Sequence, residues 1–172
     1  MRGLRRTTIS FVAILLAGCS FGFAGGGLSK DIRTVAVADC LNSTADPGIA
    51  QFVRVGVKQA VESRLGLRPA SEALADAVVH CTVVRYEPDQ AALGIQTLQG
   101  AAGTPNQVNV TKRQVELTVD LSFVDTKTGR TLWDGRGQVN RGQYSPGREI
   151  EGKQAALDLL TKALIDGVHA NW

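Results

Sequence analysis

The sequence predicts an α+β fold, a two-layer sandwich in the order β-α-β-β-β-α, with two helices packed on one face of a roughly four-stranded mixed sheet. Two segments, 48–65 and 146–170, carry apolar residues at helical spacing, and Val115 to Phe123 alternates apolar with polar residues. The chain has 172 residues, 44% of them hydrophobic and 20% charged. This composition suits one globular domain and excludes a disordered chain or a polytopic membrane protein.

The first strand is expected over Ile32–Ala38, a short run rich in β-branched residues between polar neighbours. The pair Asp46-Pro47 then predicts a helix start, because Asp caps helices and Pro fits the first helical position. The amphipathic helix is expected over 48–65, with Gly66 ending it. Residues 78–86 are largely apolar and predict a second, buried strand.

The segment 89–107 is rich in Ala, Gly and Gln and has no periodic pattern, so we expect a mobile excursion. Val108 and Val110 have the opposite parity to the strand that begins at Val115, which predicts a break near 112–113. In that strand the residues Thr118, Asp120 and Ser122 fall on the polar, solvated side.

The last two elements follow a predicted hairpin turn at 125–129, where Gly129 suits a left-handed position. The partner strand is expected over 130–139. The pair Ser145-Pro146 then predicts the start of a final helix that runs to about Ala170. Its apolar stripe should face the sheet, and consists of Leu157, Leu160, Leu164 and Val168.

Residues 1–18 have the pattern of a lipoprotein signal peptide. Three arginines precede an uncharged stretch from Thr7 to Gly18, which is too short to span a bilayer as a helix. The stretch ends in Leu16-Ala-Gly-Cys19, which resembles the lipobox whose cysteine thiol takes a diacylglyceryl group. We expect Cys19 to be the lipidated first residue of the mature chain, residues 19–30 to form a Gly-rich tether, and 31–172 to form the domain. The alternative is an ordinary secretory signal with a coincidental cysteine.

The two remaining cysteines, Cys40 and Cys81, form an even pair in a chain predicted to reach an oxidising compartment. A disulfide between them is one interpretation. The other is a pair of buried thiols, since unpaired cysteine is among the most buried residue types.

Charge and motifs exclude several functions. The pI near 8.9 comes from the arginines of residues 1–18, because the remaining chain has sixteen basic and sixteen acidic residues. This distribution argues against nucleic-acid binding. Neither His80 nor His169 has metal ligands at the usual spacing, and no serine lies in a Gly-x-Ser-x-Gly motif. We therefore expect no metal, no cofactor and no catalytic residues.

Several short motifs resemble, in order and spacing, those of the LPS-assembly lipoprotein family, LptE. They cover nearly all of the chain after the signal segment. Two positions depart from the family pattern, namely Cys40-Leu41, where an aromatic residue is usual, and His80, where glycine is frequent. The matching segments are Cys19, Phe21-Gly-Phe23, Leu28–Val37, Asn42-Ser-Thr44, Ala75-Asp76-Ala77, Asp125, Gly129–Trp133, Tyr144 and the closing helix.

The resemblance implies an outer-membrane lipoprotein that faces the periplasm, assists assembly of an LptD-like β-barrel, and helps to insert lipopolysaccharide into the outer leaflet. Ser20 favours the outer membrane, because aspartate at this position usually marks inner-membrane retention. Candidates for contact with acidic sugars or phosphates are Lys112, Arg113, Arg136 and Arg141. The alternative is that these cations lie on a solvated face and are balanced by nearby acids. Two alternatives remain, a lipoprotein that activates cell-wall synthases and a hydrolase with a scattered site.

Overall fold

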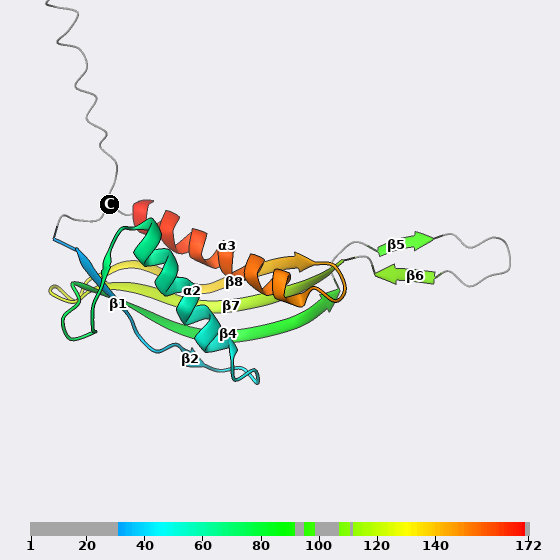
Figure 1. Cartoon of the computed structure of the whole chain (residues 1–172), viewed down its shortest axis with the longest axis horizontal. Helices are drawn as coiled ribbons and strands as arrows, with labels where there is room; N and C mark the ends of the chain where they lie inside the picture. Colours follow the sequence, from blue (N-terminus) through cyan, green and yellow to red (C-terminus); the bar gives the residue numbers. More distant parts are fainter. Residues whose placement is uncertain (1–30, 92–94, 99–106, 111, 171–172) are drawn as a thin grey trace, which may run out of the picture.

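A computed structural model describes residues 31–91, 95–98, 107–110 and 112–170, so the predicted signal peptide and tether lie outside the described residues. Two helices and eight strands lie in these ranges (Figure 1). They are β1 (Thr34–Val37), β2 (Leu41–Asn42), α2 (Ile49–Arg64), β3 (Arg68–Pro69), β4 (Ala77–Ala91), β5 (Ile95–Leu98), β6 (Gln107–Val110), β7 (Arg113–Asp125), β8 (Thr131–Tyr144) and α3 (Glu149–Ala170).

Six strands form one open, mixed sheet. Its order is β3-β1-β4-β7-β8, and β2 also pairs with β4. β1 is parallel to both β3 and β4, and β2 is parallel to β4, whereas β4, β7 and β8 are antiparallel. The helix α2 makes the crossover between parallel strands β1 and β4, as such connections require. β5 and β6 form a separate antiparallel pair that Figure 1 shows beyond one end of the sheet.

Both helices cover the same face of the sheet (Figure 1), which confirms the predicted α+β sandwich. The apolar set of β7, from Val115 to Phe123, is at most 1% exposed beneath them. The predicted stripe of α3 is buried as well, with Leu160, Leu164 and Val168 fully enclosed. Since a buried side chain of this size contributes roughly 1.5–3 kcal/mol, this layer supplies much of the folding free energy.

Close approach between α3 and β8 depends on small residues. A Cβ built on Gly142 of β8 would lie 1.9 Å from the carbonyl oxygen of Gly152 in α3. No side chain fits there, so the two glycines set how near the helix comes to the sheet.

The structure differs from the sequence prediction in several local respects. The strand predicted over 130–139 continues to Tyr144, and the final helix begins at Glu149 rather than directly after Ser145-Pro146. The first helix begins at Ile49 and has Gly48 as its N-cap, because Asp46 accepts the Gly48 N–H at 2.8 Å in a turn that precedes the helix. The segment 89–107 was expected to be a mobile excursion without periodic structure, but β4 continues to Ala91 and 95–98 is a strand, while residues 92–94 and 99–106 lie outside the described residues. The sheet has six strands rather than about four, because β2 and β3 contain two residues each. The predicted break near 112–113 is confirmed, since β6 ends at Val110.

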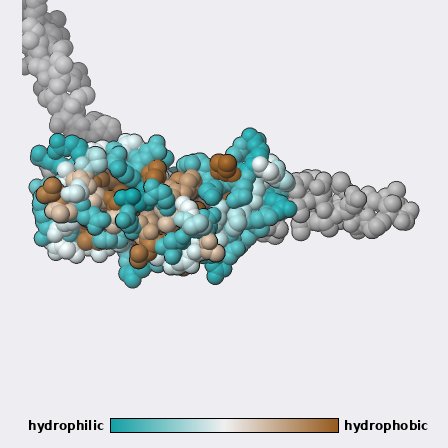
Figure 2. Space-filling view, turned by 60° about the horizontal axis from the view of Figure 1, so that its bottom comes forward, coloured by the Kyte–Doolittle hydropathy of each residue, from teal (hydrophilic) through white to brown (hydrophobic). Residues whose placement is uncertain are grey.

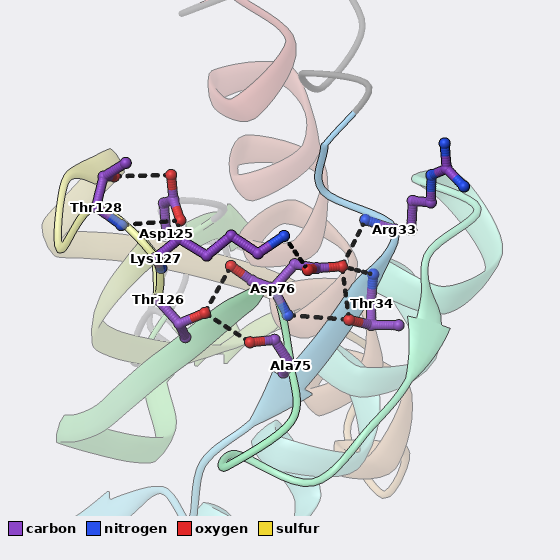
Figure 3. Close-up of polar contacts among 8 residues, drawn as sticks. All are labelled: Arg33, Thr34, Ala75, Asp76, Asp125, Thr126, Lys127 and Thr128. Carbon is purple, nitrogen blue, oxygen red and sulfur yellow. Dashed lines mark hydrogen bonds and ion pairs between the residues drawn. The ribbon is translucent and has the colours of Figure 1, made fainter.

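Asp76, just before β4, is bonded to the start of β1 and to the turn between β7 and β8, so it links three segments at this end of the sheet (Figure 3). Its carboxylate accepts the Thr34 hydroxyl at 2.8 Å and the backbone N–H groups of Arg33 and Thr34 at 3.1 Å. The Lys127 ammonium lies 2.7 Å from its other oxygen, and Thr126 donates to the Asp76 carbonyl. These bonds, led by the one to Lys127, hold the pKa of Asp76 far below its usual range.

Candidate functional site: the open face of the sheet

The sheet face turned away from the helices carries the polar side chains of β4, β7 and β8, and we call it the open face. Because successive residues of a strand point to opposite faces, its members follow from the register of the three strands. They are His80, Thr82, Arg85, Glu87, Gln114, Glu116, Thr118, Asp120, Ser122, Asp134, Arg136, Val139, Arg141 and Gln143. All of them are at least partly exposed.

A shallow hollow of about 350 Å³ lies on the open face over the middle of β4, β7 and β8. His80, Ser122 and Asp134 form one row across it, since His80 pairs with Ser122 and Ser122 with Asp134. Thr82 and Asp120 form the next row. The remaining lining residues are Cys81, Leu121, Thr131 and Arg136.

Opposite charges are paired within the hollow. The Arg136 Nε donates to both carboxylate oxygens of Asp134, at 3.0 and 2.9 Å. This contact lowers the pKa of Asp134 below its usual value and raises that of Arg136. The pair itself is formally neutral and presents donors and acceptors side by side, and Asp120 adds a second carboxylate to the hollow.

Asp120 supports the backbone of the neighbouring strand. Gly137 has a φ of +68° at a bulge in β8, and its N–H donates to the Asp120 carboxylate at 2.6 Å. Strand β7 has a register shift against β8 at this point. The sequence pattern predicts only that Asp120 lies on the solvated side of the strand. In the structure its carboxylate also accepts the hydrogen bond that supports the bulge beside the hollow.

The hollow has features of a binding surface. Among the described residues no hydrogen bond links His80 with Ser122, so no nucleophile–base pair is formed there. No cluster of three or more His, Cys, Asp or Glu side chains within the described ranges could hold a metal ion. What the surface offers is a set of neighbouring hydrogen-bonding groups of both charges.

The four candidate cations are spread along β7 and β8 rather than gathered. Arg113 is paired with Asp89, which lowers the pKa of that carboxyl. The Arg141 Nε donates to Glu116 at 2.8 Å, and Arg136 holds Asp134. Lys112 is exposed and has no ion-pair partner within the described part of the chain.

Cys40 and Cys81 are joined by a disulfide. Cys40 directly precedes β2, and Cys81 lies buried in β4 beside the residue that pairs with Leu41. The bond therefore ties the segment after β1 to the central strand.

The sequence did not indicate a cluster around Tyr86 at the far end of the sheet. The Tyr86 hydroxyl donates to Glu149 at 3.1 Å, and the Lys153 ammonium lies 5.0 Å from the Tyr86 ring centroid and 5.7 Å from that of Phe52. Burial, followed by the Glu149 contact, raises the pKa of Tyr86 above its usual range. These residues come from β4, α2 and α3, so no local spacing in the sequence could reveal the contact.

No family model matches the chain, and no curated protein matches it. Solved structures do match it. The hypothetical protein CT253 from Chlamydia trachomatis is 8% identical, with a TM-score of 0.52 over 81% of this chain and 99% of that one. Protein XCC0632 from Xanthomonas campestris is 10% identical, with a TM-score of 0.50 over 81% and 86%. Lipoprotein GNA1162 from Neisseria meningitidis is 15% identical, with a TM-score of 0.45 over 81% and 99%. The first two show a shared fold.

Proposed function

We propose that this chain is an outer-membrane lipoprotein, anchored through Cys19, that binds an LptD-like β-barrel and assists insertion of lipopolysaccharide. Two kinds of observation support the proposal. The lipobox at 16–19 and the order of the motifs after it resemble the LPS-assembly lipoproteins. The domain also leaves the open face, formed by β4, β7 and β8, at least partly exposed to a partner.

The open face is the observation that carries the proposal. The helices cover the other face, and the polar side chains of β4, β7 and β8 stay at least partly exposed. A hydrated partner surface, such as the polar interior of a barrel, can exchange hydrogen bonds with such a face at little desolvation cost. Figure 2 shows one side of the molecule, on which hydrophilic residues surround scattered hydrophobic patches.

A lipid at Cys19 would supply the membrane attachment. None of the helices in the described ranges is long and apolar enough to cross a bilayer. Each buried methylene contributes about 0.8 kcal/mol, so two or more acyl chains hold a protein stably on a membrane.

Lipopolysaccharide contact is proposed for Lys112, Arg113, Arg136 and Arg141. Arg136 and Arg141 keep 77% and 57% of their side chains exposed despite their carboxylate partners. An acidic phosphate could therefore exchange with Asp134 or Glu116 without unfolding the strand.

Copurification of a barrel with the tagged lipoprotein tests the proposal. Val139 is 46% exposed on the open face, in the edge strand β8 opposite Thr118, and Val55 is 53% exposed on α2. We expect Val139→Arg to reduce the recovered barrel at least about tenfold, because a buried unpaired charge is costly at an interface. Val55→Arg, a matched change on the helix layer, should leave recovery unchanged.

Both variants should unfold within about 0.5 kcal/mol of the parent chain, since each site is a surface valine. Recovery of the same amount of barrel with both variants would remove the open face from the interface. Recovery of a cell-wall synthase in place of a barrel would favour the alternative lipoprotein function.

A further inference from the structure

One end of the domain gathers basic side chains from separate elements, and we call it the tether end because the predicted tether runs into Asp31. Several elements meet there (Figure 1). This end contains the first residues of β1, β3 and β4, the last residues of α2 and α3, and the turn between β7 and β8. The register confirms this arrangement, since Thr34 pairs with Arg68, Val35 with Ala77, and Ala77 with Asp125.

Three arginines of the tether end have no ion-pair partner among the described residues. They are Arg64 at the end of α2, Arg68 in β3 and Arg130 in the β7–β8 turn, and all three are exposed. Four strand intervals separate β3 from β8, which is a width of about 19 Å. The three guanidinium groups therefore span the end face rather than one corner of it.

The acids of this end are largely engaged within the fold. Asp76 is bonded to Thr34 and Lys127. Asp125 accepts the Lys127 N–H at 2.8 Å and the Thr128 hydroxyl at 2.7 Å, which lowers its pKa. Glu62, in the last turn of α2, pairs with Lys58, and Asp31 and Glu72 are further carboxylates there. The arginines thus remain available to an external anion, while Asp76, Asp125 and Glu62 have partners within the fold.

We propose that the tether end docks on anionic phospholipid headgroups, with Arg64, Arg68 and Arg130 contacting lipid phosphates. The inference rests on the proposed anchor at Cys19. A Gly-rich chain of twelve residues, the length predicted for the tether, spans about 20 Å on average, so it would keep this end near the bilayer surface. Arginine forms forked hydrogen bonds with phosphate, which suits that partner.

Vesicle cosedimentation tests the docking without the lipid anchor. The chain from residue 19 onward, carrying Cys19→Ser, is mixed with vesicles of phosphatidylcholine alone or with phosphatidylglycerol at about 30%. We expect binding only to the anionic vesicles, and weaker binding as salt increases. The triple variant Arg64→Gln, Arg68→Gln, Arg130→Gln should lose affinity by at least about tenfold, since each basic residue near such a surface contributes about fivefold.

The matched control removes three cations of the helix layer, outside the tether end and the open face, through Arg54→Gln, Arg148→Gln and Lys162→Gln. It has the same net charge as the first triple variant and should bind like the parent chain. Equal losses in both triple variants, or no loss in the first, would overturn the proposal, as would failure of the parent chain to bind. Circular dichroism and thermal unfolding of each protein exclude loss through misfolding. Lipidation of Cys19 is read separately by mass spectrometry, so failure of the anchor is distinguishable from failure of the docking.

Discussion

Asp76 illustrates how one side chain can connect distant parts of this chain. The residues that it bonds are 42 positions earlier, in β1, and about 50 positions later, in the β7–β8 turn (Figure 3). Several hydrogen bonds to a carboxylate, together with a nearby cation, stabilise its charged form. Its low pKa in the folded state therefore couples the fold to pH.

We expect stability to depend on the charge of Asp76 in acid. The folded pKa lies below the unfolded value of about 3.9, so the contribution is complete above pH 4 and is lost as the pH falls through the folded pKa. Asp76→Asn should lower the midpoint of thermal unfolding at pH 7 and flatten its decrease below pH 4. Calorimetry over pH 2–7 measures this, and Asp166→Asn, in a surface pair with Lys162, is the control. An unchanged acid slope in Asp76→Asn would contradict the assignment.

The sequence alone predicts only part of what such residues do. The motif Ala75-Asp76-Ala77 was recognised through a resemblance, but its partners lie in other elements and no spacing rule links them. For Asp120 the alternation placed the side chain on the correct face, yet the bulge at Gly137 that it supports depends on the register between two strands.

At the scale of elements, the helix α3 and the strand β7 follow their sequence patterns closely. The buried and exposed sides of α3 differ sharply even between adjacent leucines, since Leu160 is fully buried and Leu159 is 47% exposed. Leu160→Ala should therefore destabilise the fold by about 2–5 kcal/mol through transfer and cavity terms. Leu159→Ala should cost less than about 1 kcal/mol. Urea unfolding of the two variants measures the difference, and equal costs would contradict the packing of α3 on the sheet.

The disulfide ties the segment between β1 and β2 to the long strand β4. Cys40 and Cys81 are 41 residues apart, so the chain-entropy model gives about 4 kcal/mol of stabilisation. We expect Cys40→Ser to lower the free energy of unfolding by about 2–4 kcal/mol, and a reductant to do the same to the parent chain. Urea titrations with and without reductant check this. A parent chain insensitive to reductant would show that the bond does not form.

The elements that the sequence could not predict are the shortest ones. Strand β7 shows five alternations, whereas β2 and β3 have two residues each, too few to reveal a period. Strand β4 extends past Pro88 to Ala91 because β7 offers a long antiparallel partner. Tertiary pairing of this kind overrides local composition.

At the scale of the whole molecule, the proposed membrane attachment depends on Cys19, which lies outside the described ranges. We expect mass spectrometry of the membrane-extracted protein to show a chain that begins at Cys19 and carries a diacylglyceryl group with its acyl chains. The expectation rests on the signal-like segment and the lipobox. The variant Cys19→Ser should remain uncleaved and unlipidated. An extracted chain with an unmodified Cys19, or with residues 1–18 retained, would contradict it.

The strand order of the sheet also determines when each part of a nascent chain can fold. β1 is parallel to β4, so after residues 31–76 have been synthesised the long strand that they need is still missing. Strands β4, β7 and β8, by contrast, are synthesised in the order in which they pair, with only β5 and β6 between β4 and β7, and α3 packs on them afterwards. Long-range pairing forms slowly because loop closure must precede it. We therefore expect the C-terminal half to nucleate first, β1 and α2 to dock last, and oxidation of Cys40 with Cys81 to mark completion of the fold.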